Sequence, residues 1–429
     1  MLFRSIVLLE FKNASGTVIA SVIESVHVYA NMSTSADGTA EIALAPTDFN
    51  SPPPVPTSFA VVDNEDRSAG LSWDASVIYT ETNFVIERHE SSDFSDASPA
   101  EFIIGANSVS YDDSSVTPGT TTYYYRVKSR NSFGDSDWAE DATGITVTNV
   151  ATGGVSIHDN TALLNSAGYT WIQGNLSIAN ISLSDLSELE LLERVDGNVS
   201  IVNCPGLTSV AGLENLTQIG GQLYLTGNAA LTDLSELSVT GTIDRLEVDD
   251  TALTSLTGLE GITAVTNDVY IHNNSSLQDI PLTGLTTVGG YLDIQNNSQH
   301  ATLDLGALET VGSYFRIDDS DQLSTVLLPA LTSVGGSFIV TYNGALTDFQ
   351  ATAAGLTIGS FLNVQYNGPT SGEASFVMSG LTTVQKENLN DYGIYVSENE
   401  FTTIDISATS TAGHVLIFDN DRLESVTLD

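Results

Sequence analysis

The chain has 429 residues, of which 54 are acidic and 12 are basic, so its formal net charge is −42 at pH 7. Nucleic acids and anionic membrane surfaces are bound by clustered Lys and Arg, so this charge argues against both as partners. The single cysteine, Cys204, excludes a disulfide framework within the chain and a cysteine zinc site. Because no apolar stretch reaches the length of a membrane span, we expect no direct membrane insertion.

Residues 1–50 alternate apolar and polar side chains in the manner of short strands separated by polar turns. The strand-like stretches read SIVLLEF, TVIASVIESVHVYA and AEIALAP. We expect them to be the C-terminal strands of a β domain that begins further upstream. Residues 51–57, SPPPVPT, are predicted to form a stiff proline-rich linker.

Residues 58–148 contain short strands separated by turns, which predicts an antiparallel β-sandwich. In the expected strand AGLSWD, Trp73 is predicted to point into the interior of the sandwich. In the run VTPGTTTYYYRVKSRNSFGDSDW (residues 116–138), Tyr123 and Tyr125 lie on one face of a strand. This segment resembles the fibronectin type III family, whose hallmark is a Y-x-Y-R-V run after a P-G-T turn. The resemblance implies that Tyr123 is the tyrosine-corner residue and that the domain is an extracellular spacer or binding module.

Residues 153–429 are organised by a repeated phrase: an apolar-x-apolar pair, an Asn, a Leu, and then L-T-x-V-G-G. The second apolar residue of the pair recurs every 23 residues at Ile271, Ile294, Ile317 and Val340. A fixed period of this length is the signature of a stacked-repeat protein. The twelve such anchor positions are Ile157, Ile178, Ile201, Leu225, Val248, Ile271, Ile294, Ile317, Val340, Val364, Val396 and Ile417. We therefore expect about twelve coils, one with an insertion within residues 368–390, and we expect the array to be C-terminally truncated because no polar capping repeat follows.

The phrase LLPALTSVGGSFIVTYNGAL (residues 327–346) resembles the receptor L-domain, a β-helix related to leucine-rich repeats and found in growth-factor receptors and in fungal and bacterial surface proteins. The cysteine-rich modules that flank the animal versions are absent, so the resemblance does not imply growth-factor binding. A leucine-rich horseshoe is the nearest competitor, but the four-residue spacing from Val288 to Leu292 favours the β-helix. The fold class is thus expected to be all-β: an antiparallel β-sandwich followed by a parallel β-helix or leucine-rich-like solenoid.

The alternation within each repeat predicts which side chains form the interior of the solenoid. Pairs such as Leu292 and Ile294 point inward, and the L-T-x-V segments form a second inward-facing wall. The Gly-Gly pairs, for example at positions 289–290 and 335–336, are predicted to allow corner conformations that other residues resist.

An Asn three residues after the anchor is expected to bond turn backbone and to stack into a ladder, with Cys204 in the same slot of its own coil. These asparagines are Asn160, Asn228, Asn274, Asn297, Asn343, Asn367, Asn399 and Asn420.

The outward strand positions vary from coil to coil, and specificity for a partner could depend on that variation. Tyrosines among carboxylates on a flat sheet are typical of a recognition face. The alternative is that Tyr is simply a good exposed strand former. The candidate ligand-binding residues are Tyr224, Arg245, Glu247, Tyr270, Tyr291, Asp293, Tyr314 and Arg316.

The sequence contains no nucleophile elbow, phosphate-binding glycine loop or dinucleotide fingerprint. The six histidines are scattered without metal-ligand spacing, so they are interpreted as surface residues. Lyases with a β-helix fold need Arg or Lys beside an acidic sugar, and basic residues are sparse here; a hydrolase needs paired carboxylates. These observations predict a protein that is not an enzyme and has no catalytic residues. Calcium at Asp318, Asp319 and Asp321 is the one cofactor left open, because hard oxygen ligands are present without a complete loop motif.

These features together predict a non-enzymatic extracellular or cell-surface binding protein, of a bacterial type. Its repeat array would present a flat β face to a protein or a glycan. Two alternatives stay open: a purely structural surface stalk, and a carbohydrate-active β-helix enzyme.

Overall fold

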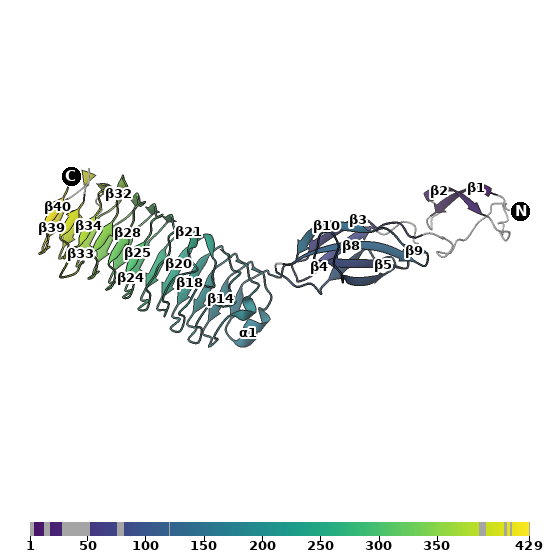
Figure 1. The fold of residues 1–429 in the computed structure, drawn as a ribbon, viewed down its shortest axis with the longest axis horizontal. Coiled ribbons are helices and arrows are strands. Elements are labelled where there is room, and N and C mark those ends of the chain that lie inside the picture. The colour runs from purple at the N-terminus through teal and green to yellow at the C-terminus, as the bar shows by residue number, and fades with distance from the viewer. Residues whose placement is uncertain are drawn as a thin grey trace. The chain divides into compact units, whose positions relative to one another are not determined.

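The computed structural model describes residues 4–12, 18–27, 52–74, 81–119, 121–385, 392–406, 410–411 and 414–428. The chain divides into two compact units, which are described separately (Figure 1). One comprises residues 1–60, 72–111 and 124–142, and the other comprises residues 61–71, 112–123 and 143–429. The domain boundaries expected from the sequence stay predictions.

The first described strands, β1 (Arg4–Lys12) and β2 (Val18–His27), form an antiparallel pair. Both lie in the region expected to consist of strands. The third expected stretch, AEIALAP at residues 40–46, lies outside the described residues.

Small antiparallel sheets occupy the region for which a sandwich was expected. A five-stranded sheet has the order β10-β8-β5-β6, with β9 paired to β8, and a three-stranded sheet has the order β3-β4-β7. The strands are β3 (Thr57–Asp63), β4 (Ala69–Asp74), β5 (Asn83–His89), β6 (Ala100–Gly105), β7 (Ser110–Asp113), β8 (Thr122–Asn131), β9 (Gly134–Asp135) and β10 (Ala139–Thr146).

The interior of this region is aromatic. The Trp73 ring of β4 lies 5.3 Å from the Phe84 ring of β5, and both side chains are buried. Strand β8 alternates strictly, so that Tyr125 and Val127 are buried while their neighbours are partly exposed. The Tyr123 hydroxyl accepts a hydrogen bond from the backbone N–H of Thr117, six residues upstream.

The first coil of the solenoid contains, after its first strands, an element that the repeat pattern did not predict, the short helix α1 (Asn160–Asn165). Its N-cap is Asp159, whose carboxylate accepts a hydrogen bond from the backbone N–H of Ala162 at 2.7 Å. Asn160 is exposed at the start of this helix. The expectation that Asn160 belongs to the asparagine ladder is therefore wrong, because the helix replaces the turn at that position. A short 3-10 helix, η2 (Ser187–Leu189), lies in a later coil.

The main element is a parallel sheet, which we name the long sheet; it contains twelve strands in the described part of the chain (Figure 1). Its strands are β12 (Val155–Ile157), β14 (Leu176–Ala179), β16 (Val199–Val202), β18 (Gln222–Thr226), β20 (Arg245–Asp249), β22 (Val269–His272), β24 (Leu292–Gln295), β27 (Phe315–Asp318), β30 (Phe338–Thr341), β33 (Leu362–Gln365), β36 (Tyr392–Ser397) and β39 (His414–Phe418). The predicted anchors pair directly, Ile271 with Ile294, Ile294 with Ile317, and Ile317 with Val340. The fold is therefore a parallel β-solenoid of about eleven turns, counted as the steps between twelve stacked strands.

Three shorter parallel sheets complete the walls. A four-stranded sheet contains β11 (Val150–Ala151), β13 (Trp171–Ile172), β15 (Arg194–Val195) and β17 (Gln218–Ile219). An eight-stranded sheet contains β19 (Thr240–Ile243), β21 (Gly261–Val265), β23 (Thr287–Val288), β26 (Thr310–Val311), β29 (Ser333–Val334), β32 (Leu356–Ile358), β35 (Leu381–Val384) and β38 (Ser410–Thr411). A six-stranded sheet contains β25 (Thr302–Asp304), β28 (Thr325–Leu327), β31 (Asp348–Gln350), β34 (Ser375–Val377), β37 (Thr403–Asp405) and β40 (Ser425–Thr427). The expected insertion lies partly in the described residues before β34, and partly in residues 386–391, outside them.

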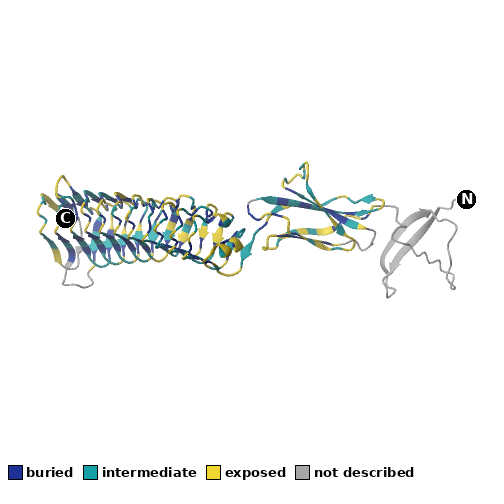
Figure 2. Ribbon diagram, turned by 90° about the horizontal axis from the view of Figure 1, so that it is seen from below, coloured by how far each residue is buried: buried dark blue, intermediate teal, exposed yellow. Residues whose placement is uncertain are grey.

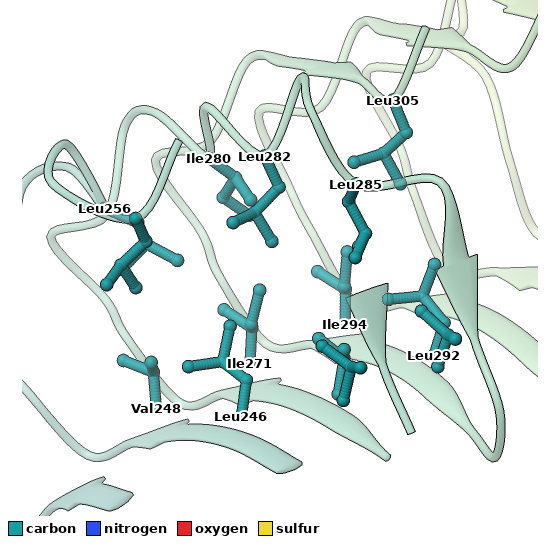
Figure 3. Close-up of a cluster of buried hydrophobic side chains, with 14 of the residues drawn as sticks. Leu246, Val248, Leu256, Ile271, Ile280, Leu282, Leu285, Leu292, Ile294 and Leu305 are labelled. Carbon is teal, nitrogen blue, oxygen red and sulfur yellow. The ribbon is translucent and has the colours of Figure 1, made fainter. Parts of the chain in front are cut away.

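The apolar residues of each coil meet inside the solenoid (Figure 3), and residues coloured as buried recur along its strands (Figure 2). Leu292 and Ile294 of the long sheet point toward Leu285 from the opposite side of the same coil, and all three are buried (Figure 3). In later coils the core becomes aromatic: the rings of Phe315 and Phe338 stack with centroids 4.5 Å apart. One coil exposes these side chains above and below, so burial depends on stacking successive coils.

The glycines that follow the L-T-x-V segments have a different role from the one expected. Gly289, Gly312 and Gly335 have no left-handed φ. A Cβ at Gly312 would overlap the carbonyl oxygen of Gly289, and a Cβ at Gly335 would overlap that of Gly312. The prediction of special corner conformations is thus wrong. These residues are glycines because neighbouring coils approach each other closely at this position.

The asparagine ladder is present, and all of its members except Asn420 are buried in the interior of the turns. Asn274, for example, accepts a hydrogen bond from the Thr251 backbone N–H at 3.1 Å and donates to the carbonyl oxygen of Val248 at 3.0 Å and to Asn297 at 3.2 Å. Cys204 fills one step, where its backbone N–H donates to Asn228. Burial raises the pKa of the Cys204 thiol, which keeps it protonated. The ladder members are Asn228, Asn274, Asn297, Asn343, Asn367, Asn399 and Asn420.

Candidate functional site

The candidate residues predicted from the sequence gather on the outward side of the long sheet. Strand pairing places Tyr224 beside Glu247, Glu247 beside Tyr270, Tyr270 beside Asp293, and Asp293 beside Arg316. These five residues therefore form one row across five successive coils.

Of the other candidates, Arg245 is the first residue of β20, and Tyr291 and Tyr314 directly precede β24 and β27, beside the same row. The Tyr291 and Tyr314 rings stack with centroids 4.2 Å apart, and the Tyr270 ring lies edge-on to Tyr291 at 6.5 Å. We name the whole set the central face: Tyr224, Arg245, Glu247, Tyr270, Tyr291, Asp293, Tyr314 and Arg316.

Arg245 connects the first half of the central face. Its guanidinium carbon lies 4.6 Å from the centroid of the Tyr270 ring and 5.7 Å from that of Tyr224. One of its terminal nitrogens is 2.7 Å from a carboxylate oxygen of Glu247. This combination of ring contacts and an ion pair fixes a long, flexible side chain in one position on the sheet.

Asp293 is the most buried member, with 2% of its surface exposed although it lies on the outward side of the sheet. Its carboxylate accepts hydrogen bonds from the Tyr314 hydroxyl at 3.2 Å and from the side-chain amide of Gln295 at 2.7 Å. Burial, together with the nearby charge of Asp293, raises the pKa of Tyr314 above its usual value. Burial also raises the pKa of Tyr270, with a further contribution from Asp268. Both hydroxyls therefore stay protonated and can donate hydrogen bonds.

The residues expected to hold calcium are not arranged around a common point. Asp318 lies at the end of β27, where its carboxylate accepts hydrogen bonds from Arg316 at 2.8 Å and from the Thr341 hydroxyl. Asp319 and Asp321 are exposed in the following turn. Among the residues that the structure describes, no group of three or more His, Cys, Asp or Glu side chains is arranged to hold a metal ion. Calcium binding stays a prediction.

Two histidines contradict the surface interpretation. His89 has 1% of its surface exposed and contacts Glu87 at 3.2 Å. His300 is fully buried, and its Nδ1 lies 3.3 Å from the carbonyl oxygen of Gln278. Burial lowers the pKa of His300, so the neutral ring is favoured. Histidine is intermediate in burial preference, and scattered spacing says nothing about which face a ring occupies.

The sequence analysis missed a further row of residues, which we name the outer turn row. The residue directly after each strand of the long sheet from β14 to β39 adopts a left-handed backbone, with φ from 49° to 57° in the non-glycine members of the row and 68° at Gly227. The row is Asn180, Asn203, Gly227, Asp250, Asn273, Asn296, Asp319, Tyr342, Tyr366, Glu398 and Asp419. Asn, Asp and Gly are the residues that tolerate this conformation best, and they fill most of it. The signal available from the sequence was the pair Tyr342 and Tyr366 at positions where other coils carry Asn or Asp.

Two depressions of about 380 Å³ each lie elsewhere on the molecule, one lined by Arg88, Glu90 and Asp96 among others, and one by Arg194, Asp196 and Gln218 among others. Neither is lined by a central-face residue. No helix among the described residues is long and apolar enough to cross a bilayer.

Comparison with known families gives one match: the family model described as Receptor L domain matches residues 168–282. These residues cover the first coils and part of the central face. The match is to the same family as the resemblance noted in the sequence, although the phrase that carried it, residues 327–346, lies beyond the matched residues. No curated protein matches the chain.

Comparison with solved structures gives pectate lyases. Pectate lyase Pel3 from Pectobacterium carotovorum is 12% identical, with 74% of this chain and 92% of that chain covered and a TM-score of 0.17. Pectate lyase PelI from Erwinia chrysanthemi is 13% identical, with 80% and 97% covered and a TM-score of 0.17. A structure of PelI in complex with tetragalacturonic acid gives 12% identity, the same coverage and the same TM-score of 0.17.

The prediction that the chain is not an enzyme is contradicted by these matches, which are to pectate lyases. That prediction is withdrawn. At a TM-score of 0.17, however, the likeness carries no argument that this chain has lyase activity.

Proposed function

We propose that this protein is an extracellular or cell-surface recognition protein, of bacterial type, whose central face binds a partner that is either a protein or a glycan. The observation that supports this proposal is the assembly of four tyrosines, two arginines and two carboxylates on adjacent coils of one sheet. Tyr and Arg are the residue types that contribute most to binding energy at protein interfaces.

The central face is already ordered before any partner arrives. Arg245 is held by two rings and Glu247, and Tyr314 is held by Tyr291 and Asp293. A side chain that is fixed in the free protein loses little conformational entropy on binding, so more of the contact energy appears as affinity. A flat face of this kind suits a broad partner surface better than a small molecule, which needs a concave site.

We also propose that residues 58–148 form a fibronectin type III domain that acts as a spacer or binding module. The supporting observations are the burial of Trp73 and Tyr125 and the hydrogen bond that the Tyr123 hydroxyl accepts from Thr117. The last is the contact that a tyrosine corner makes with upstream backbone.

A structural stalk is the second candidate. It is favoured by the fact that many polar groups of the central face are bonded to each other, as Arg245 is to Glu247 and Asp293 to Gln295. Contacts of this kind between coils stabilise a solenoid whether or not a partner exists.

The test is a binding screen of the full chain against surface proteins and a glycan array, repeated with a Tyr270→Ala, Tyr291→Ala double variant. We expect at least one tight ligand, and a loss of about tenfold or more in affinity for it in the double variant. The matched control is Tyr169→Ala, a tyrosine outside the central face. If a folded wild-type chain, checked by circular dichroism, binds nothing, or if the double variant binds its ligand unchanged, the central face is a structural surface.

A further inference from the structure

The outer turn row changes character at one point. From Asp250 to Asp319 it carries short polar side chains, and at Tyr342 and Tyr366 it carries two tyrosines. The Tyr342 and Tyr366 backbones have φ values of 57°, a left-handed conformation that costs a residue such as Tyr roughly 1 kcal/mol and that Asn adopts more readily. The substitution of the favoured residue type by Tyr in two consecutive coils needs a physical reason.

Packing against the protein explains little of this choice. Tyr342 has 53% of its surface exposed and Tyr366 has 37%. Their rings stack on each other with centroids 4.6 Å apart and an angle of 11° between the planes. The Tyr366 hydroxyl donates a hydrogen bond to Glu398 at 2.9 Å, which fixes the ring nearer the C-terminal end. Two exposed, ordered rings therefore form a small aromatic step, which we name the tyrosine ledge.

The ledge has one ring face that the protein leaves uncovered. A ring separation of 4.6 Å is close to the distance between adjacent strands, about 4.8 Å, so the rings stack along the direction in which the coils succeed each other. Tyr366 covers one face of Tyr342, and the opposite face is directed at the preceding coil. That coil carries Asp319 in this row, a side chain too short to cover a tyrosine ring.

We propose that the free face of Tyr342 binds a pyranose ring of an uncharged glycan, seated over Asp319 where a further tyrosine of the stack would lie. The C–H-bearing face of a sugar is apolar and weakly positive, and the face of an aromatic ring is negative, so the two stack favourably. The site uses residues outside the central face, and it stands or fails independently of the function proposed above.

The floor of the site supplies hydrogen-bonding groups for sugar hydroxyls. The Asp319 carboxylate is exposed and accepts no hydrogen bond from the described residues. In the coil before it, the side-chain nitrogen of the exposed Asn296 donates to Asn273 at 2.8 Å, and its side-chain oxygen can serve as an acceptor. Hydroxyl groups both donate and accept, so a row of carboxylates and amides at the coil spacing suits a glycan chain that runs along the row.

Charge selects among glycans. The same row carries a carboxylate on either side of the ledge, Asp319 in the preceding coil and Glu398 in the following one, and the whole chain carries a net charge of −42. An acidic polysaccharide would be repelled by this surface, whereas an uncharged one would not.

The competing interpretation is that the tyrosine stack only stabilises the solenoid. Stacked pairs contribute about 0.5–1.5 kcal/mol, which is similar to the cost of the left-handed backbone. The two interpretations predict different results for Tyr342→Asn, which places in this coil the residue that Asn273 and Asn296 provide in others. The fold should tolerate this substitution, and a sugar-binding site should not.

The experiment measures binding of the full chain to cellohexaose, laminarihexaose and mannohexaose, and to a galacturonic acid oligomer as the acidic arm, by isothermal titration calorimetry. We expect millimolar or tighter binding of an uncharged hexasaccharide, a loss of about tenfold or more in Tyr342→Asn, and retention within about threefold in Tyr342→Phe. The Tyr270→Ala, Tyr291→Ala double variant serves as the matched control and should bind the sugar as the wild type does.

Several results would overturn the proposal. The first is that the chain binds no uncharged hexasaccharide at millimolar concentration. The second is that it binds only the acidic oligomer, and the third is that Tyr342→Asn binds the hexasaccharide with unchanged affinity. A protein ligand that is lost in Tyr342→Asn, without any sugar binding, would assign the ledge to protein docking instead. Thermal melts of each variant keep these outcomes separate from unfolding.

Discussion

The central face and the tyrosine ledge are built from the same residue type on the same solenoid, yet their tyrosines are in opposite situations. In the central face each ring contacts other protein groups: Tyr270 contacts Arg245, and Tyr314 contacts Tyr291 and Asp293. At the ledge, Tyr342 contacts one ring and leaves more than half of its surface exposed. The central-face tyrosines lie on or directly before strands, where side chains of adjacent coils surround them. The ledge tyrosines lie in turns, where fewer side chains contact the rings.

This difference teaches which tyrosines are needed for the fold and which are free for a ligand. A side chain that contacts protein groups on several sides contributes to stability, so its removal destabilises the protein. The same contacts keep it ordered for a binding partner. A side chain held on one side can be exchanged at little structural cost. The predictions below test this contrast, from the largest expected effect to the smallest.

The largest effect is expected from Asn343→Ala, which removes the ladder step directly behind the ledge. Asn343 accepts a hydrogen bond from the Ser320 backbone N–H at 3.2 Å, and it donates to Thr341 at 2.9 Å and to Asn367 at 2.9 Å, all in a buried environment. Leaving such groups without partners should lower the free energy of unfolding by about 3 kcal/mol in urea denaturation. Asn160→Ala, at the matching sequence position but exposed in α1, should change it by less than about 0.5 kcal/mol. Equal effects of the two substitutions would contradict the ladder.

The second effect compares the two regions directly. Tyr270→Ala should lower the free energy of unfolding by about 2 kcal/mol, because it removes a half-buried ring from Arg245 and Tyr291. The measurement is a chemical denaturation curve for the full chain. A cost near zero would show that the central face is as loosely held as the ledge.

The third prediction concerns alkaline pH. Burial and Asp293 raise the pKa of Tyr314 above its model-peptide value of 10.0, so the folded state retains this proton where the unfolded state has lost it. The associated stability is fully present below about pH 10 and is lost as the pH rises further. Tyr314→Phe should therefore reduce the decline in the urea midpoint between about pH 9.5 and 11. If the urea midpoint declines equally in the wild type and in Tyr314→Phe, ionisation of Tyr314 does not cause the loss of stability.

The smallest effect is expected at the ledge. Tyr342→Asn loses a ring stack and gains a residue suited to the left-handed backbone, so the free energy of unfolding should change by less than about 1 kcal/mol in either direction. The result is obtained from the same denaturation curves. A loss above about 2 kcal/mol would make the ledge part of the structural framework.

Much of the solenoid was predictable from the sequence because its period is explicit. The 23-residue spacing of Ile271, Ile294 and Ile317 fixes which strands pair, and alternation fixes which side chains face inward. Once strand pairing is known, the row that contains Tyr224, Tyr270 and Arg316 follows directly. The central face was therefore within reach of pattern reasoning alone.

The rest depended on contacts that a pattern does not contain. The glycine at position 312 is required by the carbonyl of the previous coil, not by its own φ, and sequence shows only that a glycine is there. The helix α1 depends on a cap at Asp159, which overrides the repeat at Asn160. The ledge was missed because Tyr342 follows a strand end, and the repeat pattern does not show that the turn there has a left-handed backbone.

The most direct test of the account is a paired binding measurement on the full chain. The Tyr270→Ala, Tyr291→Ala variant and the Tyr342→Asn variant are titrated, side by side with wild type, with the partner found in the binding screen and with the uncharged hexasaccharide. The account predicts a crossed result, in which the first variant loses the partner and keeps the sugar while the second keeps the partner and loses the sugar. If both variants lose both ligands, or if neither variant loses a ligand, the assignment of two separate sites to the solenoid is wrong.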